Sequence, residues 1–489
     1  MLFKDSKKRQ EKSKMEKLVK QYGTSAFMYT QYPHKRFWKE KKNDEKYREI
    51  LSSLANSDRA APALLYLHIP YCKQLCYFCT CHMAITTEHS KVKDYMNLLY
   101  QEIDAFAEFI TENNIKLNIK EIHLGGGSPT FIDIPEFDIL CDKLGKLTNL
   151  KELDEFAIEV DPRRVERERL EYYGKKGINR LSFGIQDFDI NVQTAINRIQ
   201  PVELIENLLT PEIKDLFTNG INFDIICGLP NQTPETIKMT AQECIRLSPH
   251  RICLNYLHYS PVFAPHQLLM IDGNQGRPNN LPDFFERKVL FQTAQDTLEN
   301  GGFVRTGYDH FARADDKVVE AMDDKKMHWN SLGVTPGEYT NIIGLGISSE
   351  STIGDYYFQN HYDMPDYISS IKKGEFPIYR EHQLCQEDVI RKDTIQQIRN
   401  YFEVDLNEIS ARYNINSEQY FHDELVNIKS LEKDDILSYE NGVIRLTEIG
   451  RQFTNIVCRT FDKYYTGSLL KQDLGQRDNY KSRKLKERV

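Results

Sequence analysis

The chain has 489 residues, with 64 lysines and arginines against 72 aspartates and glutamates, and hydrophobic residues make up 40% of it. This length allows two to four domains with a large buried core. No window is apolar enough to cross a membrane, and the first twenty residues lack the apolar run of a secretion signal. A net charge of −8 argues against a general nucleic-acid binder. We therefore expect a cytoplasmic protein with no membrane span and no nucleic-acid partner.

Strand and helix patterns alternate over residues 61–315. The first strong strand is 63–70, and the later predicted strands are 119–126, 155–162, 178–186, 221–230, 250–258 and 302–310. Amphipathic stretches such as 92–110 and 233–248 predict helices between them. Strands separated by helices form right-handed crossovers and a parallel sheet, open or closed into a barrel. Ligands bind at the carboxyl ends of such strands.

Four further segments flank this predicted α/β barrel of residues 61–315. We expect an N-terminal arm and cap over 1–60, a substrate or second-ligand segment over 316–379, a mainly helical domain over 380–465 and a polar tail over 466–489. Asn441-Gly442 lies between two short apolar runs, which is a strong hairpin signal. Helices followed by a hairpin resemble a winged-helix module.

Four of the ten cysteines, Cys72, Cys76, Cys79 and Cys81, fall within ten positions directly after the first strand. In a reducing compartment such a group indicates metal or redox chemistry rather than disulfides. No second pair of cysteines or histidines at zinc-site spacing accompanies it. Three thiolates on one irregular loop suit an iron–sulfur cluster. The spacing favours a cluster, while zinc and unligated cysteines stay as alternatives.

The stretch HIPYCKQLCYFCTC, residues 68–81, resembles the CxxxCxxC signature of the radical S-adenosylmethionine (SAM) superfamily. Its extended form, with a fourth cysteine, is similar to that of the oxygen-independent coproporphyrinogen III dehydrogenases. The likeness continues in order through HLGGGSPTF (123–131), IEVDPR (158–163), NRLSFGIQDF (179–188), DIICGLPNQTPE (224–235) and GYDHFAR (307–313). It covers roughly residues 20–465.

The resemblance implies an incomplete parallel radical SAM barrel with two cofactors. Cys72, Cys76 and Cys79 would ligate a [4Fe–4S] cluster and leave one iron open for SAM, with Cys81 outside the ligand set. SAM itself, bound once or twice, would contact residues at the ends of the strands: Tyr66, Gly125, Gly126, Ser128, Glu159, Gln186, Arg198 and Asp224. Carboxylates and amides suit ribose hydroxyls, and arginine suits the SAM carboxylate. No further catalytic side chain is expected beyond the cluster and SAM.

The implied activity is anaerobic oxidative decarboxylation of coproporphyrinogen III propionates to vinyl groups, a step of haem biosynthesis that gives protoporphyrinogen IX. A low-potential electron donor of the flavodoxin or ferredoxin type would feed the cluster. The protein is expected to be a monomer. Four arginines, Arg163, Arg164, Arg305 and Arg313, are available to pair with substrate propionates.

Several positions depart from the family pattern around the site for a second SAM. These are Met28, Leu257, Ser331, Leu332 and Glu350, together with Trp329 and Val334. Leucine cannot replace the hydrogen bonds of glutamine, and glutamate adds a charge. The alternatives are therefore a paralogous radical SAM enzyme with another substrate, acting in haem opening, methyl transfer or cyclopropanation, and a haem chaperone that cleaves no SAM.

Overall fold

The computed structural model describes residues 13–22, 29–41, 43–56, 61–272, 280–330, 332–337 and 341–465. The chain forms two compact units. One contains residues 36–258 and 269–385, and the other contains residues 1–35, 259–268 and 386–489. The five-part division expected from the sequence stays a prediction.

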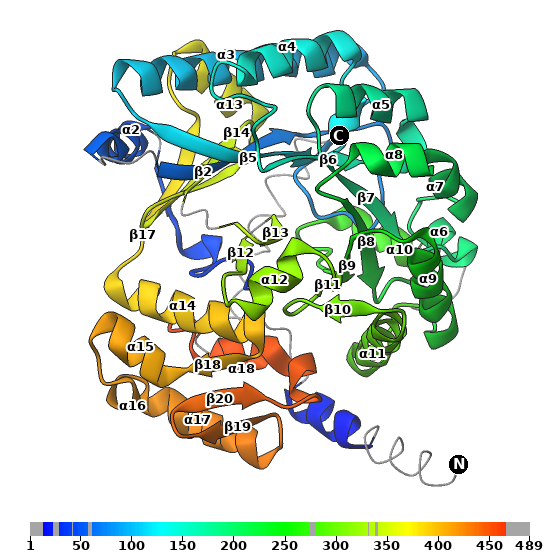
Figure 1. The fold of residues 1–489 in the computed structure, drawn as a ribbon, viewed down its shortest axis with the longest axis vertical. Coiled ribbons are helices and arrows are strands. Elements are labelled where there is room, and N and C mark those ends of the chain that lie inside the picture. Colours follow the sequence, from blue (N-terminus) through cyan, green and yellow to red (C-terminus); the bar gives the residue numbers. More distant parts are fainter. Residues whose placement is uncertain are drawn as a thin grey trace. The chain divides into compact units, whose positions relative to one another are not determined.

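A single sheet of 13 strands forms the centre of the first unit (Figure 1). Seven neighbouring strands run parallel, in the order β14, β2, β5, β6, β7, β8, β9. Their bounds are Asn341–Leu345, Ala61–Ile69, Leu117–Gly126, Glu155–Val160, Arg180–Gln186, Ile221–Cys227 and Arg251–Tyr256. The order ends in β1 (Lys39–Glu40) on one side and β10 (Phe303–Arg305) on the other, so the sheet is an open barrel. The predicted parallel core is confirmed.

The outer strands of this sheet differ from the prediction. Residues 302–310 are not one strand but two, β10 and β11 (His310–Arg313), which pair antiparallel. Gly307 lies between them with a φ of +79°, a conformation that allows the chain to turn back. At the other edge an antiparallel extension follows β14, made of β15 (Glu350–Ile353), β16 (Tyr356–Asn360) and β17 (Ile378–Gln383).

Helices cover the outer face of the parallel strands (Figure 1). Among the helices of this unit, those of nine or more residues are α2 (Glu45–Ser53), α3 (His89–Glu112), α4 (Ile134–Leu144), α5 (Arg167–Lys175), α9 (Pro234–Leu247), α11 (Phe284–Asn300) and α13 (Met364–Lys372). The shorter helices of the unit are α6 (Ile190–Ala195), α7 (Val202–Leu208), α8 (Pro211–Leu216), α10 (Leu269–Asp272) and α12 (Lys317–Asp323). Short strands β3 (Tyr71–Cys72), β4 (Ala84–Ile85), β12 (His328–Asn330) and β13 (Gly333–Thr335) complete the unit.

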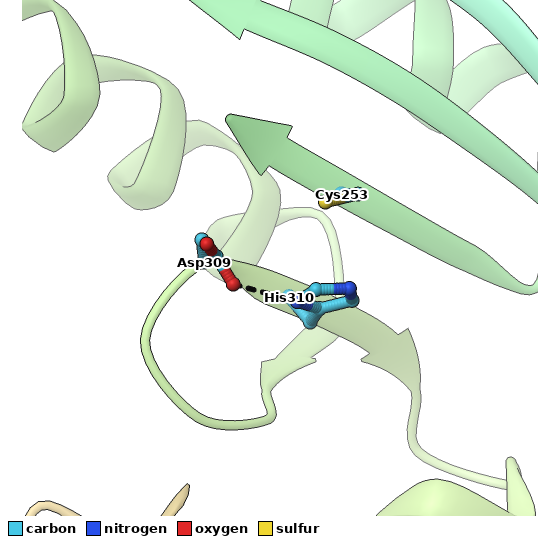
Figure 2. Close-up of side chains that lie close together, drawn as sticks. All are labelled: Cys253, Asp309 and His310. Atoms are coloured by element: carbon cyan, nitrogen blue, oxygen red, sulfur yellow. Dashed lines mark hydrogen bonds and ion pairs between the residues drawn. The ribbon is translucent and has the colours of Figure 1, made fainter. Parts of the chain in front are cut away.

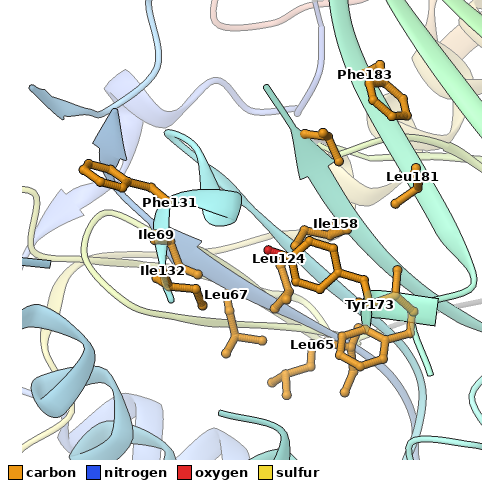
Figure 3. Packing of buried hydrophobic residues seen from close by; sticks show 14 of the residues in the cluster. Leu65, Leu67, Ile69, Leu124, Phe131, Ile132, Ile158, Tyr173, Leu181 and Phe183 are labelled. Atoms are coloured by element: carbon orange, nitrogen blue, oxygen red, sulfur yellow. The ribbon is translucent and has the colours of Figure 1, made fainter. Parts of the chain in front are cut away.

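Alternate residues of each parallel strand face the helices and form the core. On β2, Leu65, Leu67 and Ile69 are fully buried and pack with Leu124, Ile158 and Leu181 of the neighbouring strands (Figure 3). Successive side chains of a strand point to opposite faces. Tyr66 and His68 therefore face the inside of the barrel, where polar residues gather.

The second unit contains a helix over residues 13–22 and the C-terminal helices α14 (Gln386–Tyr401), α15 (Leu406–Tyr413), α16 (Ser417–Tyr420), α17 (His422–Lys433) and α18 (Thr454–Thr460). A small antiparallel sheet has the order β18 (Glu403–Asp405), β20 (Val443–Leu446), β19 (Leu437–Glu440). Asn441 and Gly442 both have positive φ at the predicted hairpin, as a tight two-residue turn requires. The prediction of a helical domain with a hairpin is confirmed. The predicted polar tail, 466–489, lies outside the described residues.

One buried carboxylate fixes the turn between β14 and β15. Glu102 of α3 is 1% exposed and accepts hydrogen bonds from the Tyr367 hydroxyl at 2.6 Å, the Gly346 amide at 2.8 Å and the Asn360 side chain at 2.9 Å. Burial raises the pKa of Glu102 from 4.5 to about 7, against the three hydrogen bonds, which lower it. The carboxylate thus connects α3 with a stretch that lies 244 to 265 residues further along the chain.

This pKa predicts a component of stability that depends on pH. The folded chain holds the Glu102 proton to a higher pH than the unfolded chain, so stability falls as pH rises from about 4.5 to about 7. Replacement Glu102→Gln removes the ionisation. Between pH 5 and pH 8 the free energy of unfolding of the wild type should fall relative to that of E102Q by on the order of 1–3 kcal/mol. Urea unfolding at the two pH values measures this difference.

The matched control is Glu112→Gln, an exposed glutamate on the same helix. It should leave the pH slope of the wild type unchanged. Equal slopes in wild type and E102Q would show that folding does not raise the pKa of Glu102.

Candidate active site

The cysteine loop begins directly after β2. Strands β3 and β4 pair in parallel, with Tyr71 opposite Ala84 and Cys72 opposite Ile85, and so close the loop at its base. The amide of Thr86 donates to the Cys72 carbonyl at 3.0 Å, and the amide of Cys79 donates to the Cys76 carbonyl at 3.1 Å. Within the described residues Cys72, Cys76 and Cys79 form no disulfide, and the loop brings them from one short stretch of backbone.

A turn after α6 holds the outer part of this loop. The Asn197 side chain donates to the Leu75 carbonyl at 2.8 Å, and the Tyr77 amide donates to the Ile196 carbonyl at 3.0 Å. Asn197 has a φ of +55°, a conformation in which asparagine is more common than most residues. The Asn197-Arg198 pair therefore fixes the loop from a second element.

Two arginines reach the sulfur of Cys76. Arg198 Nη1 lies 3.4 Å from Cys76 Sγ and Arg163 Nη2 lies 3.5 Å from it. Both arginines also pair with Asp161, Arg163 at 2.8 Å and Arg198 at 3.5 Å. Burial raises the pKa of Asp161, but the charges of Arg198 and Arg163 outweigh it and bring the value to about 2. The ionised carboxylate thus holds two cations beside the Cys76 sulfur.

The thiols do not form a site for a single ion. In the part of the chain that the structure describes, the sulfur atoms of Cys72, Cys76 and Cys79 do not all lie within 4.8 Å of one another. Ligands of one zinc ion would converge in this way, whereas thiolates bind a cubane cluster at separate corners. Burial raises the pKa of the Cys72 thiol to about 12, with a further contribution from Cys76. A metal centre is what would keep such a thiol deprotonated.

Cys81 is exposed and lies next to Cys79. A hydrogen bond with Cys79 is the largest cause that raises the pKa of the Cys81 thiol. Its position beside a cluster cysteine follows from the spacing in the sequence.

Glycines let the end of β5 approach the inner-face residues of β2 and β6. A Cβ on Gly125 would lie 2.6 Å from Glu159 Oε1 and 3.0 Å from the Tyr66 ring. Gly126 has a φ of +114° and donates its amide to Glu159 Oε2 at 3.2 Å. Tyr66, Gly125, Gly126 and Glu159 are thus in direct contact, as the strand-end argument predicts.

Tyr66 is connected to the cysteine loop through a histidine. The Tyr66 hydroxyl lies 3.0 Å from His68 Nδ1, and His68 Nε2 lies 2.9 Å from the His82 carbonyl. Burial lowers the pKa of His68 to about 4, so the ring is neutral at pH 7. Ser128, at the end of the glycine run, donates its amide to the Tyr71 carbonyl, and its hydroxyl lies 3.3 Å from that of Thr130.

Gln186 shows two signs of a ligand site. Its φ is +67°, which is strained for a residue other than glycine, and its buried Oε1 has no hydrogen-bond partner among the described residues. The buried Nε of Arg198 lacks a partner in the same sense. A carbonyl oxygen and a guanidinium nitrogen with unmet hydrogen bonds suit the hydroxyl and carboxylate groups of SAM. The residues present therefore fit this cofactor.

Asp224 completes the inner face on β8. Its carboxylate accepts hydrogen bonds from Asn222 at 2.9 Å and Ser182 at 3.2 Å. Burial and the charge of Glu159 raise the pKa of Asp224. The carboxylates of Asp224 and Glu159 therefore act on one another.

Known proteins match this chain over most of its length. The Radical SAM superfamily pattern matches residues 66–244. The oxygen-independent coproporphyrinogen III oxidase of Helicobacter pylori J99 is 31% identical over 449 residues, which cover 91% of this chain and 96% of that protein. The chain belongs to this family. The Escherichia coli K12 relative is also 31% identical, over 91% of this chain and 94% of its own.

The fold of the family is equally clear. A solved structure of coproporphyrinogen III oxidase from Escherichia coli, a radical SAM enzyme, superposes with a TM-score of 0.81 at 31% identity, over 90% of this chain and 98% of that one. The resemblance found in the sequence is thereby confirmed, with its radical SAM barrel and helical C-terminal domain. As a radical SAM enzyme of the oxygen-independent coproporphyrinogen III oxidase family, the protein uses a [4Fe–4S] cluster and SAM. Within the described residues no helix is long and apolar enough to span a membrane.

One of the positions that depart from the family pattern acts on the polar inner face. Glu350, on β15, raises the pKa of Tyr66 through its charge, as Glu159 does, in addition to the larger effect of burial. Leu257 is 5% exposed, and Leu332 is half-buried in the turn between β12 and β13. Met28 and Ser331 lie outside the described residues.

Three of the four arginines expected to pair with propionates have partners within the chain, and their contact with substrate stays a prediction. Arg163, a predicted partner of substrate propionates, is bound to Asp161 and Cys76. Arg305 is buried and donates to Gln295 and to the Tyr308 carbonyl, while Arg313 pairs with Asp315. Sequence reasoning missed the loop-holding role of Arg163, because nothing in IEVDPR indicates that its side chain turns back toward the cysteines.

Replacement Cys76→Ala should prevent cluster assembly. The variant loses one of three thiolates, and the one that both arginines contact, so anaerobic reconstitution should leave little protein-bound iron and sulfide and no cluster absorbance. Cys385→Ala, which removes an exposed thiol outside the loop, is the matched control and should load fully. Retained cluster and SAM cleavage in C76A would contradict the ligand assignment.

Proposed function

We propose that this protein catalyses anaerobic oxidative decarboxylation of two propionate side chains of coproporphyrinogen III to vinyl groups, which yields protoporphyrinogen IX. The supporting observation is the match to coproporphyrinogen III oxidases over 91% of the chain, combined with a thiol loop that adjoins the polar inner face of the barrel. Haem biosynthesis is the corresponding process.

When bound, the cluster and SAM supply a 5′-deoxyadenosyl radical, which takes a hydrogen atom from the β-carbon of a propionate. The carboxyl group then leaves as carbon dioxide, the α- and β-carbons remain as the vinyl group, and the one remaining electron passes to an external acceptor. Two such cycles make two vinyl groups. Each cycle consumes one SAM and forms one methionine and one 5′-deoxyadenosine.

The chain's own residues bind and orient these groups. Cys72, Cys76 and Cys79 ligate the cluster, and Arg163 and Arg198 stabilise the Cys76 thiolate. Gln186 Oε1, Arg198 Nε, Glu159 and Asp224 offer the polar atoms for SAM. Gly125 and Gly126 leave room for it, and Tyr66 and Ser128 complete the surroundings.

The surroundings of the reaction follow from its chemistry. The cluster needs an electron at low potential, which a donor of the flavodoxin or ferredoxin type supplies. We further propose that the protein acts in the cytoplasm as a monomer.

A second candidate function rests on the altered inner-face positions. Glu350 places a carboxylate whose charge reaches Tyr66, and Leu257 and Leu332 offer no side-chain hydrogen bond. These residues favour a paralogue that keeps the first SAM site and acts on another substrate, as in haem opening, methyl transfer or cyclopropanation.

An anaerobic assay with SAM, dithionite and coproporphyrinogen III separates these functions. The expected result is loss of two carboxyl groups per porphyrinogen, with one 5′-deoxyadenosine for each, as read by mass spectrometry. The cluster-free variant C76A and a reaction without SAM serve as controls.

Other outcomes would each contradict the proposal. Deoxyadenosine without a vinyl product would favour the paralogue. Haem binding without any deoxyadenosine or methionine would favour a haem chaperone.

A further inference from the structure

A row of three inner-face residues crosses the last strands of the barrel. Asp224 of β8 lies opposite Cys253 of β9, and Cys253 lies opposite His310 of β11. Residues in register on neighbouring strands share a face of the sheet.

Asp309 fixes the orientation of the His310 ring. Its side chain is buried, and its Oδ1 lies 2.7 Å from His310 Nδ1. Figure 2 marks this interaction with a dashed line. A buried carboxylate accepts a hydrogen bond, so Nδ1 carries the proton and Nε2 becomes the acceptor of the neutral ring. The same carboxylate–imidazole arrangement positions histidines in many active sites.

The other ring nitrogen is open to the barrel interior. His310 Nε2 has no hydrogen-bond partner among the described residues. This nitrogen is not fully buried. A Cβ on Gly333 would lie 3.1 Å from it. Glycine at this position leaves space directly beside Nε2.

His310 lies on the side of the barrel away from the strands that meet the cofactor. The cysteine loop follows β2, and the residues that fit SAM end β5, β6, β7 and β8. With neighbouring strands about 4.8 Å apart, β11 lies roughly 10 Å beyond β8. This side of the polar space is left for the substrate.

A metal ion would suit this row less well. One ligand atom each from Cys253, Asp309 and His310 lies within 4.8 Å of the others, so the donor types alone would allow a metal. However, coordination by Asp309 Oδ1 and His310 Nδ1 together would break the hydrogen bond between them. The observed pair is complete without an ion and leaves Nε2 for a ligand.

We propose that His310 is a substrate-binding residue whose Nε2 accepts a hydrogen bond from a pyrrole N–H of the porphyrinogen, and that Asp309 is its positioning residue. This inference rests on the proposed function. A porphyrinogen presents two kinds of polar group, pyrrole N–H donors and carboxylates. Carboxylates cannot donate to Nε2, and the nearby carboxylates of Asp309 and Asp224 repel them.

Two substitutions separate this role from a structural one. In His310→Asn the amide nitrogen replaces Nδ1 and retains the bond to Asp309, but Nε2 is lost. In His310→Gln the longer side chain places an amide group near the position of Nε2, where its oxygen can accept a hydrogen bond. Cys253→Ala, on the same face, is the matched control. Binding of coproporphyrinogen III is measured anaerobically without reductant, by equilibrium dialysis and fluorescence after oxidation to the porphyrin.

We expect H310N to weaken coproporphyrinogen binding by about tenfold or more, because a ligand N–H loses its acceptor. H310Q should bind coproporphyrinogen within about threefold of the wild type, because glutamine keeps an acceptor. C253A should also bind within about threefold, because it leaves His310 unchanged. SAM affinity, and deoxyadenosine formed with dithionite but no porphyrinogen, should not change in any variant. These cofactor readouts also show that each variant is folded.

Three results would overturn the inference: normal binding by H310N, equal weakening in H310N and H310Q, or a loss of SAM affinity in H310N, which would place His310 in the cofactor site. Failure of the proposed function gives a different result. If the wild type binds coproporphyrinogen but makes no vinyl product, the reaction is wrong while the binding series still tests His310. If the wild type does not bind coproporphyrinogen, both proposals fall.

Discussion

The site depends on the alternation of side chains along the parallel strands. Burial of one face against the helices sets the orientation of every strand, because a shift by one residue would turn the apolar face inward. With Leu65, Leu67 and Ile69 in the core, Tyr66 and His68 must face the barrel interior. The hydrophobic effect, which is not specific in itself, thus places the specific polar groups.

The cysteine loop adds a second constraint, since irregular backbone needs partners from elsewhere. Asn197 supplies one to the Leu75 carbonyl, and Arg198 and Arg163 supply cations to Cys76. Asp161 compensates the two arginines. Loss of one partner of such a buried pair commonly costs about 3–5 kcal/mol, so these residues hold the loop as well as tune its chemistry.

The inner face also explains why one scaffold serves related reactions. The end of the barrel near the cysteine loop carries the groups that fit SAM, while the far strands and the β12–β13 hairpin carry His310, Gly333 and Leu332. Glu350 acts on the polar space through Tyr66 and comes from β15, outside the cysteine loop. Substrate choice can therefore vary while the radical chemistry stays the same.

The sequence by itself determined the parallel core, the cysteine loop and the residues at the strand ends, because each depends on local patterns. Strand periodicity, the CxxxCxxC spacing and the Asn441-Gly442 turn are read within a few residues. The sequence did not separate β10 from β11, because one glycine, Gly307, turns the chain inside the stretch 302–310. Only the tertiary structure turned Arg163 toward Cys76 and aligned Asp224, Cys253 and His310. These contacts join residues 29 to 87 positions apart, and strand register and packing, which a local pattern does not contain, decide them.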